Sequence, residues 1–122
     1  MYKNYILIVF IFPVVVCSCA SNRLERSDFS GRKYSLSVPF VPQKQEGYCG
    51  PVALTMVLSY WKDLIEQDQI AKSIYLPFLK GSLSIDLVQY AKARGFNAEL
   101  YVSNLQDVKD KIRLGYPLIA AM

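Results

Sequence analysis

Histidine is absent from the 122 residues of the chain. This absence excludes a histidine-ligated metal site and any complete Cys-His or Ser-His-Asp catalytic set within the chain. The three cysteines are too few for a disulfide framework, and too few for a structural zinc site without histidine. We therefore expect no metal ion and no other cofactor.

The chain is also short and carries little net charge. Its length allows one small domain plus a targeting segment, and a composition of 52% apolar and 20% charged residues is typical of a globular protein. The net charge of +4 comes from scattered basic residues, without a basic block or a basic and aromatic stripe. We therefore expect no nucleic-acid partner.

No apolar run is long enough to span a bilayer. The longest runs from Tyr5 to Cys17 after a single basic residue, Lys3. As a helix it would measure about 20 Å, whereas the hydrocarbon core of a membrane is about 30 Å thick. A short apolar run after a basic start is typical of a secretion signal, and Pro13 within it disfavours a permanent straight helix.

The end of this run, Val16-Cys17-Ser18-Cys19, resembles the bacterial lipobox. The resemblance implies a lipoprotein-type signal over residues 1–19, cleavage before Cys19, and lipidation of the Cys19 thiol. The mature protein would then be exported and held at a membrane of the bacterial cell envelope. An ordinary signal with two incidental cysteines and a Cys-x-Cys metal pair are the alternatives. Residues 20–33 are polar and aperiodic, which predicts a flexible tether.

Residues 34–122 are predicted to fold as an α+β domain. Helical periodicity and helix-end signals dominate its first part, and two strand-like apolar segments come later. This order predicts a helix-rich first part followed by the first strands of an incomplete sheet. Apolar residues 53, 56, 57 and 60 are predicted to form one face of the first helix. Ser103-x-x-Gln106 has the spacing of a capping box. The predicted helices are 50–61, 67–75, 84–94 and one ending at Gly115, with strands at 96–102 and 117–122.

Cys49 is the strongest candidate for chemistry. It stands at the predicted start of a helix, and helix N-termini lower the pKa of a thiol and so favour the nucleophilic thiolate. Gly50 would leave space beside the sulfur for a substrate backbone. Gln43, six residues earlier, could donate an amide N–H to a developing oxyanion. The alternative is that Cys49 is a small buried apolar residue at a helix start.

The stretch from Val38 to Gln43 and the stretch from Cys49 to Leu54 resemble the start of the bacteriocin-processing (double-glycine leader) cysteine peptidases. This papain-like family includes stand-alone lipoproteins. The resemblance covers about residues 36–122 and implies an α+β fold with a central helix beginning at the nucleophile, followed by an incomplete antiparallel sheet. It further implies that Cys49 is the nucleophile, that Gln43 is the oxyanion donor, and that the substrate is a peptide or protein.

The family also needs a histidine as proton acceptor, which this chain lacks. No pattern places Asp63, Asp68 or Asp86 near Cys49 as a replacement. We therefore expect the N-terminal portion of a papain-like peptidase domain, inactive alone because general base catalysis is typically worth 100- to 10,000-fold. The alternatives are a non-enzymatic, degenerate peptidase-like lipoprotein that binds peptides or is a remnant, and a transglutaminase or amidase that uses the same cysteine arrangement.

Overall fold

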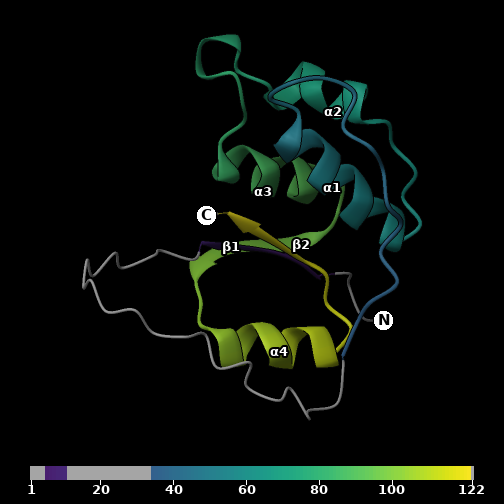
Figure 1. The fold of residues 1–122 in the computed structure, drawn as a ribbon, viewed down its shortest axis with the longest axis vertical. Coiled ribbons are helices and arrows are strands. Elements are labelled where there is room, and N and C mark those ends of the chain that lie inside the picture. The colour runs from purple at the N-terminus through teal and green to yellow at the C-terminus, as the bar shows by residue number, and fades with distance from the viewer. Residues whose placement is uncertain (1–4, 11–33, 122) are drawn as a thin grey trace, which may run out of the picture.

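The computed structural model describes residues 5–10 and 34–121 and shows helices on both sides of a small sheet (Figure 1). The predicted tether at 20–33 and the predicted lipidation site Cys19 lie outside the described residues. Within the described ranges, no helix has both the length and the apolar character that a membrane crossing requires.

The helices lie close to the positions predicted from the sequence. Each predicted helix is present, and the ends differ from the prediction by one or two residues. Gly95 follows α3 with φ of +89°, where its N–H donates to Lys92 O at 2.9 Å, so the predicted left-handed helix end is confirmed. The bounds are α1 Cys49–Tyr60, α2 Gln67–Ile74, the 3₁₀ helix η1 Pro77–Leu79, α3 Ser84–Ala93 and α4 Leu105–Arg113.

The capping residue of α4 is Asn104, one position after the predicted Ser103. The Asn104 side chain accepts a hydrogen bond from the backbone N–H of Asp107 at 3.0 Å. Ser103 instead donates its hydroxyl to the carboxylate of Asp107 at 2.5 Å. Serine and asparagine are both favoured as the residue that caps a helix N-terminus. The shift by one position therefore keeps a side-chain cap and changes only the residue that provides it.

The sheet has three strands in the order β2-β1-β3, with β1 Tyr5–Phe10, β2 Asn97–Val102 and β3 Leu118–Ala121. Both ladders of β1 are parallel, which corrects the predicted antiparallel sheet. The physical reason is the connection: α4 carries the chain from the end of β2 back to the start of β3, and such a crossover makes strands run in the same direction.

The middle strand comes from the segment predicted to be a secretion signal. In β1, Ile6 pairs in register with Ala98 and Ile8 with Ile119, and the side chains of Ile6 and Ile8 are fully buried. The sequence did not predict this strand. It is a property of the uncleaved chain, and the signal itself stays a prediction.

The core lies between the sheet and the helices α1, α2 and α3. α1 and α3 cover one face of the sheet, α2 packs on α1 at the far side, and α4 lies across the opposite face (Figure 1). This arrangement places the start of α1 away from the sheet, at the surface. The buried core cluster comprises Ile6, Ile8, Leu54, Val57, Leu58, Ile70, Ile74, Leu87, Val88, Ala91 and Ala98.

Candidate active site

Cys49 is the first residue of α1, and it is an exposed free thiol. The preceding residue, Tyr48, ends the loop, and its carbonyl accepts the N–H of Val52 at 2.9 Å, so the helix begins directly at the cysteine. No acidic residue occupies the first turn of α1. The thiol is exposed, so the alternative of a buried apolar cysteine is wrong, and the sulfur is open to reagents.

Gln43 lies in the irregular segment that leads into the turn before Cys49. Its side-chain Nε2 donates to the carbonyl oxygen of Gln45 at 2.7 Å, and the backbone N–H of Tyr48 donates to the same oxygen at 3.3 Å. The carboxamide of Gln43 and the residue next to Cys49 therefore share one acceptor. Within the described part of the chain, no hydrogen bond joins Gln43 directly to Cys49.

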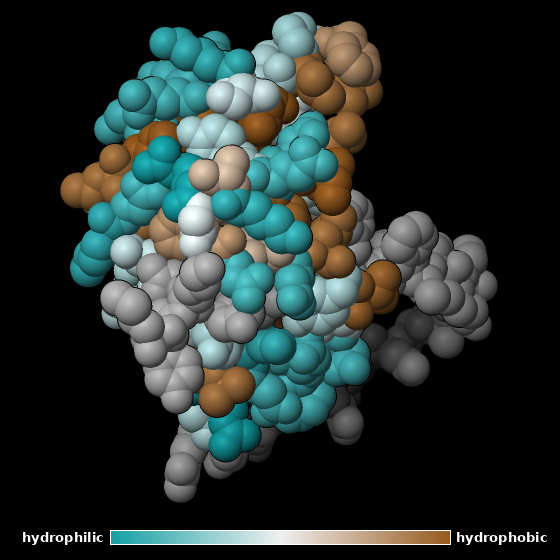
Figure 2. Space-filling model, turned by 180° about the vertical axis from the view of Figure 1, so that it is seen from behind, coloured by the Kyte–Doolittle hydropathy of each residue, from teal (hydrophilic) through white to brown (hydrophobic). Residues whose placement is uncertain are grey.

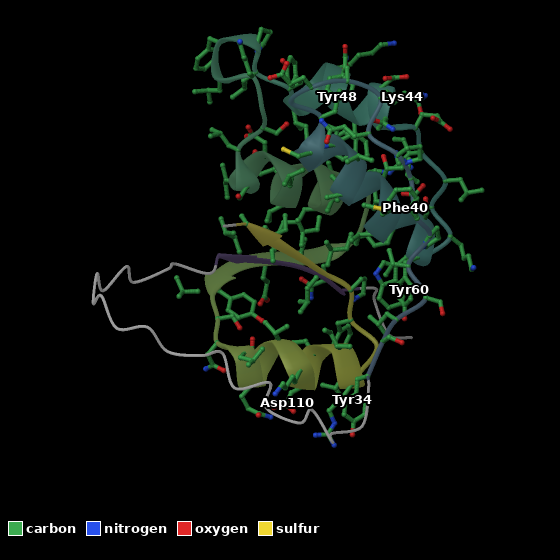
Figure 3. The ribbon with its side chains drawn as sticks, viewed as in Figure 1. Tyr34, Phe40, Lys44, Tyr48, Tyr60 and Asp110 are labelled. Carbon is green, nitrogen blue, oxygen red and sulfur yellow. The ribbon has the colours of Figure 1, made fainter. Side chains whose placement is uncertain are left out.

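The turn packs closely against the segment that follows α2. Gly47 has φ of +82°, and a Cβ atom there would lie 2.5 Å from the carbonyl oxygen of Lys80 and 2.9 Å from the ring of Tyr75. The ring of Tyr48 meets that of Tyr75 edge to face, with 5.4 Å between centroids. These contacts hold the turn before Cys49 in one place. Figure 3 shows Tyr48 near the start of α1 and Lys44 at the same end of the molecule.

The space beside Gly50 is filled by protein, which corrects the expectation that it accommodates a substrate backbone. A Cβ atom at Gly50 would lie 3.1 Å from the Cβ of Ser82 and 3.5 Å from a methyl group of Leu87. The absence of a side chain at residue 50 thus lets the start of α3 approach α1. The Ser82 hydroxyl is buried there without a hydrogen-bond partner. The accessible side of Cys49 must lie elsewhere.

Gln67 holds the backbone on both sides of Gln43, and the sequence did not predict this role. It is 1% exposed at the start of α2, its Nε2 donates to Pro42 O at 2.8 Å, and its Oε1 accepts the N–H of Lys44 at 3.0 Å. The Lys44 ammonium pairs with Asp68 at 2.7 Å and Glu66 at 3.2 Å, and these hydrogen bonds raise the pKa of Lys44. No local pattern marks Gln67, because its partners lie 23 and 25 residues away.

No carboxylate in the described residues is hydrogen-bonded to Cys49. Asp63 makes two 2.6 Å hydrogen bonds to Arg94 beyond the other end of α1, and Asp68 is paired with Lys44. Asp86 lies in the first turn of α3. Among the described ranges, no group of three potential metal ligands is gathered closely enough to hold an ion. The described residues thus place an exposed thiol after a segment that carries a carboxamide, with no carboxylate hydrogen-bonded to the thiol.

The loop carrying η1 presents apolar side chains to solvent next to this turn. Its ends meet in a bridge between Leu76 and Gly81, while Phe78 is 80% exposed and Leu79 is 50% exposed. Figure 2 shows this apolar surface at the upper edge of the rear face. Since Lys80 O abuts Gly47, the exposed apolar loop borders the turn before Cys49.

Comparison with known proteins places the chain in a family. The model described as the Peptidase_C39 like family matches residues 35–122, and the chain therefore belongs to this family of papain-like, peptidase-like proteins. The match confirms the resemblance carried by the residues around Gln43 and Cys49 and the α+β, papain-like fold class. Searches of the curated proteins and of the solved structures found no match.

Proposed function

We propose that the chain is an exported, lipid-anchored cysteine peptidase-like protein whose Cys49 thiolate attacks the carbonyl carbon of a peptide or protein substrate. The observation that carries the proposal is the exposed thiol at the first residue of α1 in a member of a peptidase family. The partial positive charge of a helix N-terminus favours negative charge at this position. The exposed apolar loop around η1 offers a surface for apolar side chains of a peptide.

Gln43 is proposed as the donor to the oxyanion. A glutamine amide carries two hydrogens on Nε2, and one of these is engaged by Gln45 O. The second is free to donate to the oxygen that becomes negative when the sulfur attacks. No histidine is present to accept the thiol proton, and no carboxylate of the described residues is hydrogen-bonded to Cys49. We expect no peptide hydrolysis by this chain alone.

The proposal is tested by comparing two reagents that differ in the charge they develop. With p-nitrophenyl acetate, the sulfur attacks the carbonyl carbon, an oxyanion forms, the ester C–O bond breaks and nitrophenolate leaves with the electron pair. The thiol proton passes to the buffer. With iodoacetamide, the sulfur displaces iodide from a tetrahedral carbon, and no oxyanion forms. The ratio of the two rates therefore reports stabilisation of the oxyanion alone.

We expect site-resolved mass spectrometry of the full chain to find Cys49 both acetylated and alkylated, with both products lost in Cys49→Ala. We expect Gln43→Ala to lower the acetylation rate about tenfold and to leave the alkylation rate unchanged, since one oxyanion donor is worth 100- to 1,000-fold in a complete enzyme. Gln45→Ala is the matched control, because the backbone oxygen of residue 45 remains. A ratio unchanged by Gln43→Ala would contradict the proposed role.

A non-enzymatic, peptide-binding lipoprotein is the second candidate, favoured by the missing histidine and the exposed Phe78 and Leu79. It requires no stabilisation of an oxyanion. Under this alternative, Gln43→Ala leaves both rates unchanged, whereas replacing the two apolar residues weakens peptide binding measured by fluorescence anisotropy. The same two sets of variants therefore separate the candidates.

Anchoring through Cys19 is supported by the lipobox-like sequence and by the short apolar run before it. In a bacterial host supplied with an alkyne-tagged fatty acid, we expect the label to appear on the chain and to be lost in Cys19→Ala. Cys17→Ala is the control, because Val16 is bulky at the position where the pattern has a small residue.

A further inference from the structure

We propose that Gln67 is a positioning residue that fixes the backbone on both sides of Gln43. This inference rests on the proposed function, because it assigns to Gln67 the task of holding the oxyanion donor in place. Gln67 belongs to α2, and within the described residues its side chain makes no hydrogen bond to Cys49. Its action on the chemistry is therefore through the segment that carries Gln43.

The geometry of the Gln67 amide matches the chain segment it holds. Its Nε2 donates to the carbonyl oxygen of Pro42 at 2.8 Å, and its Oε1 accepts the N–H of Lys44 at 3.0 Å. These two peptide groups flank Gln43, so one side chain fixes the backbone before it and after it. With Gln67 only 1% exposed, water has little access to either bond. Hydrogen bonds in such surroundings are costly to leave unmade.

A glutamine is specifically suited to this position. A primary amide presents an acceptor and a donor in the same plane, and asparagine would fall one methylene short. A glutamate could accept from Lys44 N–H but could not donate to Pro42 O while ionised. The chemistry of the side chain and both of its partners thus account for a fully buried polar residue at the start of α2.

The outer contacts of the same segment are weaker and cannot replace the Gln67 contact. The Lys44 ammonium reaches Glu66 and Asp68, which flank Gln67 along the chain, but these side chains are about half exposed or more. Exposed ion pairs of this kind contribute little and are screened by salt. The buried amide is therefore the contact that fixes where Gln43 can place its donor, and a misplaced donor loses much of its effect.

The test uses the ratio of Cys49 acetylation by p-nitrophenyl acetate to its alkylation by iodoacetamide in the full chain. We expect Gln67→Ala to lower this ratio about tenfold, and Gln67→Glu to lower it less, because one of the two hydrogen bonds remains. Gln69→Ala, an exposed glutamine on the same helix, is the control and keeps the wild-type ratio. Simple loss of structure would change the alkylation rate as well, so a lower ratio with an unchanged alkylation rate identifies the positioning role.

The coupling to Gln43 separates this inference from the proposed function. In a Gln43→Ala background, we expect Gln67→Ala to cause no further fall in the ratio, because the group it positions is gone. If Gln43→Ala lowers the ratio and both Gln67 variants keep it, the positioning role is overturned while the proposed function stands. If Gln43→Ala itself has no effect, both are overturned. Gln67→Glu keeps the test open should Gln67→Ala fail to fold.

Discussion

Gly47 lies two residues before Cys49, at a point where two backbone segments touch. Its φ of +82° is in the left-handed region, and an added methyl group would lie 2.5 Å from Lys80 O. Gly95 offers a natural comparison: its φ is +89°, but nothing lies within 4 Å of the position that its Cβ would take. The two glycines share the conformational strain and differ only in the space around them.

At the residue scale, we therefore expect Gly47→Ala to be more destabilising than Gly95→Ala. Both substitutions incur the cost of a left-handed alanine, about 1–2 kcal/mol, but only Gly47→Ala must also move the turn away from Lys80. Urea unfolding measures the free energies, and the acetylation rate of Cys49 reports the displaced turn. Equal destabilisation with unchanged acetylation in both variants would contradict the role given to this contact.

The helix start at Cys49 could be predicted at this scale, and the contacts that hold the segment before it could not. The adjacent residues Cys49, Gly50 and Pro51 predict a helix start, which the structure confirms. Gln67 has no such neighbours, because a side chain that holds a distant backbone leaves no local pattern. The predicted open space beside Gly50 is wrong for the same reason, since the atoms that fill it come from the distant residues Ser82 and Leu87.

The start of α4 is held by a small polar cluster centred on Asp107. The hydroxyls of Ser103 and Tyr101 both donate to one Asp107 carboxylate oxygen, at 2.5 and 2.7 Å, and these bonds lower the pKa of Asp107. Burial, followed by the hydrogen bond to Asp107, raises the pKa of Tyr101 to about 12. The cluster is complete only while the aspartate is ionised and the tyrosine is protonated.

At the element scale, we expect this cluster to add pH dependence to the stability of the chain. A lowered aspartate pKa gives stabilisation that is present above the ordinary value of 3.8 and is lost as the pH falls through the lower, folded-state pKa. A raised tyrosine pKa gives stabilisation that is present below 10.0 and is lost as the pH rises towards about 12. Urea midpoints of wild type and Asp107→Asn, compared from pH 7 to pH 2, should converge on acidification. Parallel curves would argue against the cluster.

The helices were predictable as elements but not in their orientation. Strong end signals such as Gly95 and Pro51 set the helix bounds, which are local properties. The predicted apolar face of α1 is wrong in part: Val57 is buried, but Leu54 and Leu58 are fully buried in place of Met56 and Tyr60. Because α1 is apolar on most sides, its periodicity does not select the face that meets the core.

At the scale of the whole molecule, β1 joins parts of the chain that are distant in sequence. Ile6 and Ile8 are fully buried in the core, and β2 and β3 both pair with β1. The sequence could not predict this strand, since its partners lie more than 80 residues away and its local features indicate a secretion signal. An apolar segment of this length suits both a signal and a buried strand.

We expect Ile6→Ala and Ile8→Ala each to destabilise the uncleaved chain by about 2–5 kcal/mol, as is usual for a fully buried isoleucine. Leu100→Ala in β2 is the control, because Leu100 is 36% exposed and should cost much less. Urea unfolding of the purified full chain measures the three values. Costs at Ile6 and Ile8 no larger than that at Leu100 would show that β1 is not part of the folded core.

The central position of β1 gives the timing of maturation a structural meaning. Neighbouring strands lie about 4.8 Å apart, so β2 and β3 are separated by about twice that distance while β1 stands between them. Cleavage before Cys19, as proposed, would remove β1. The edges of β2 and β3 that pair with β1 would then be left with unpaired backbone N–H and C=O groups, separated by a gap one strand wide. A chain cut before Cys19 would therefore have to bring β2 and β3 into direct pairing or place another strand between them.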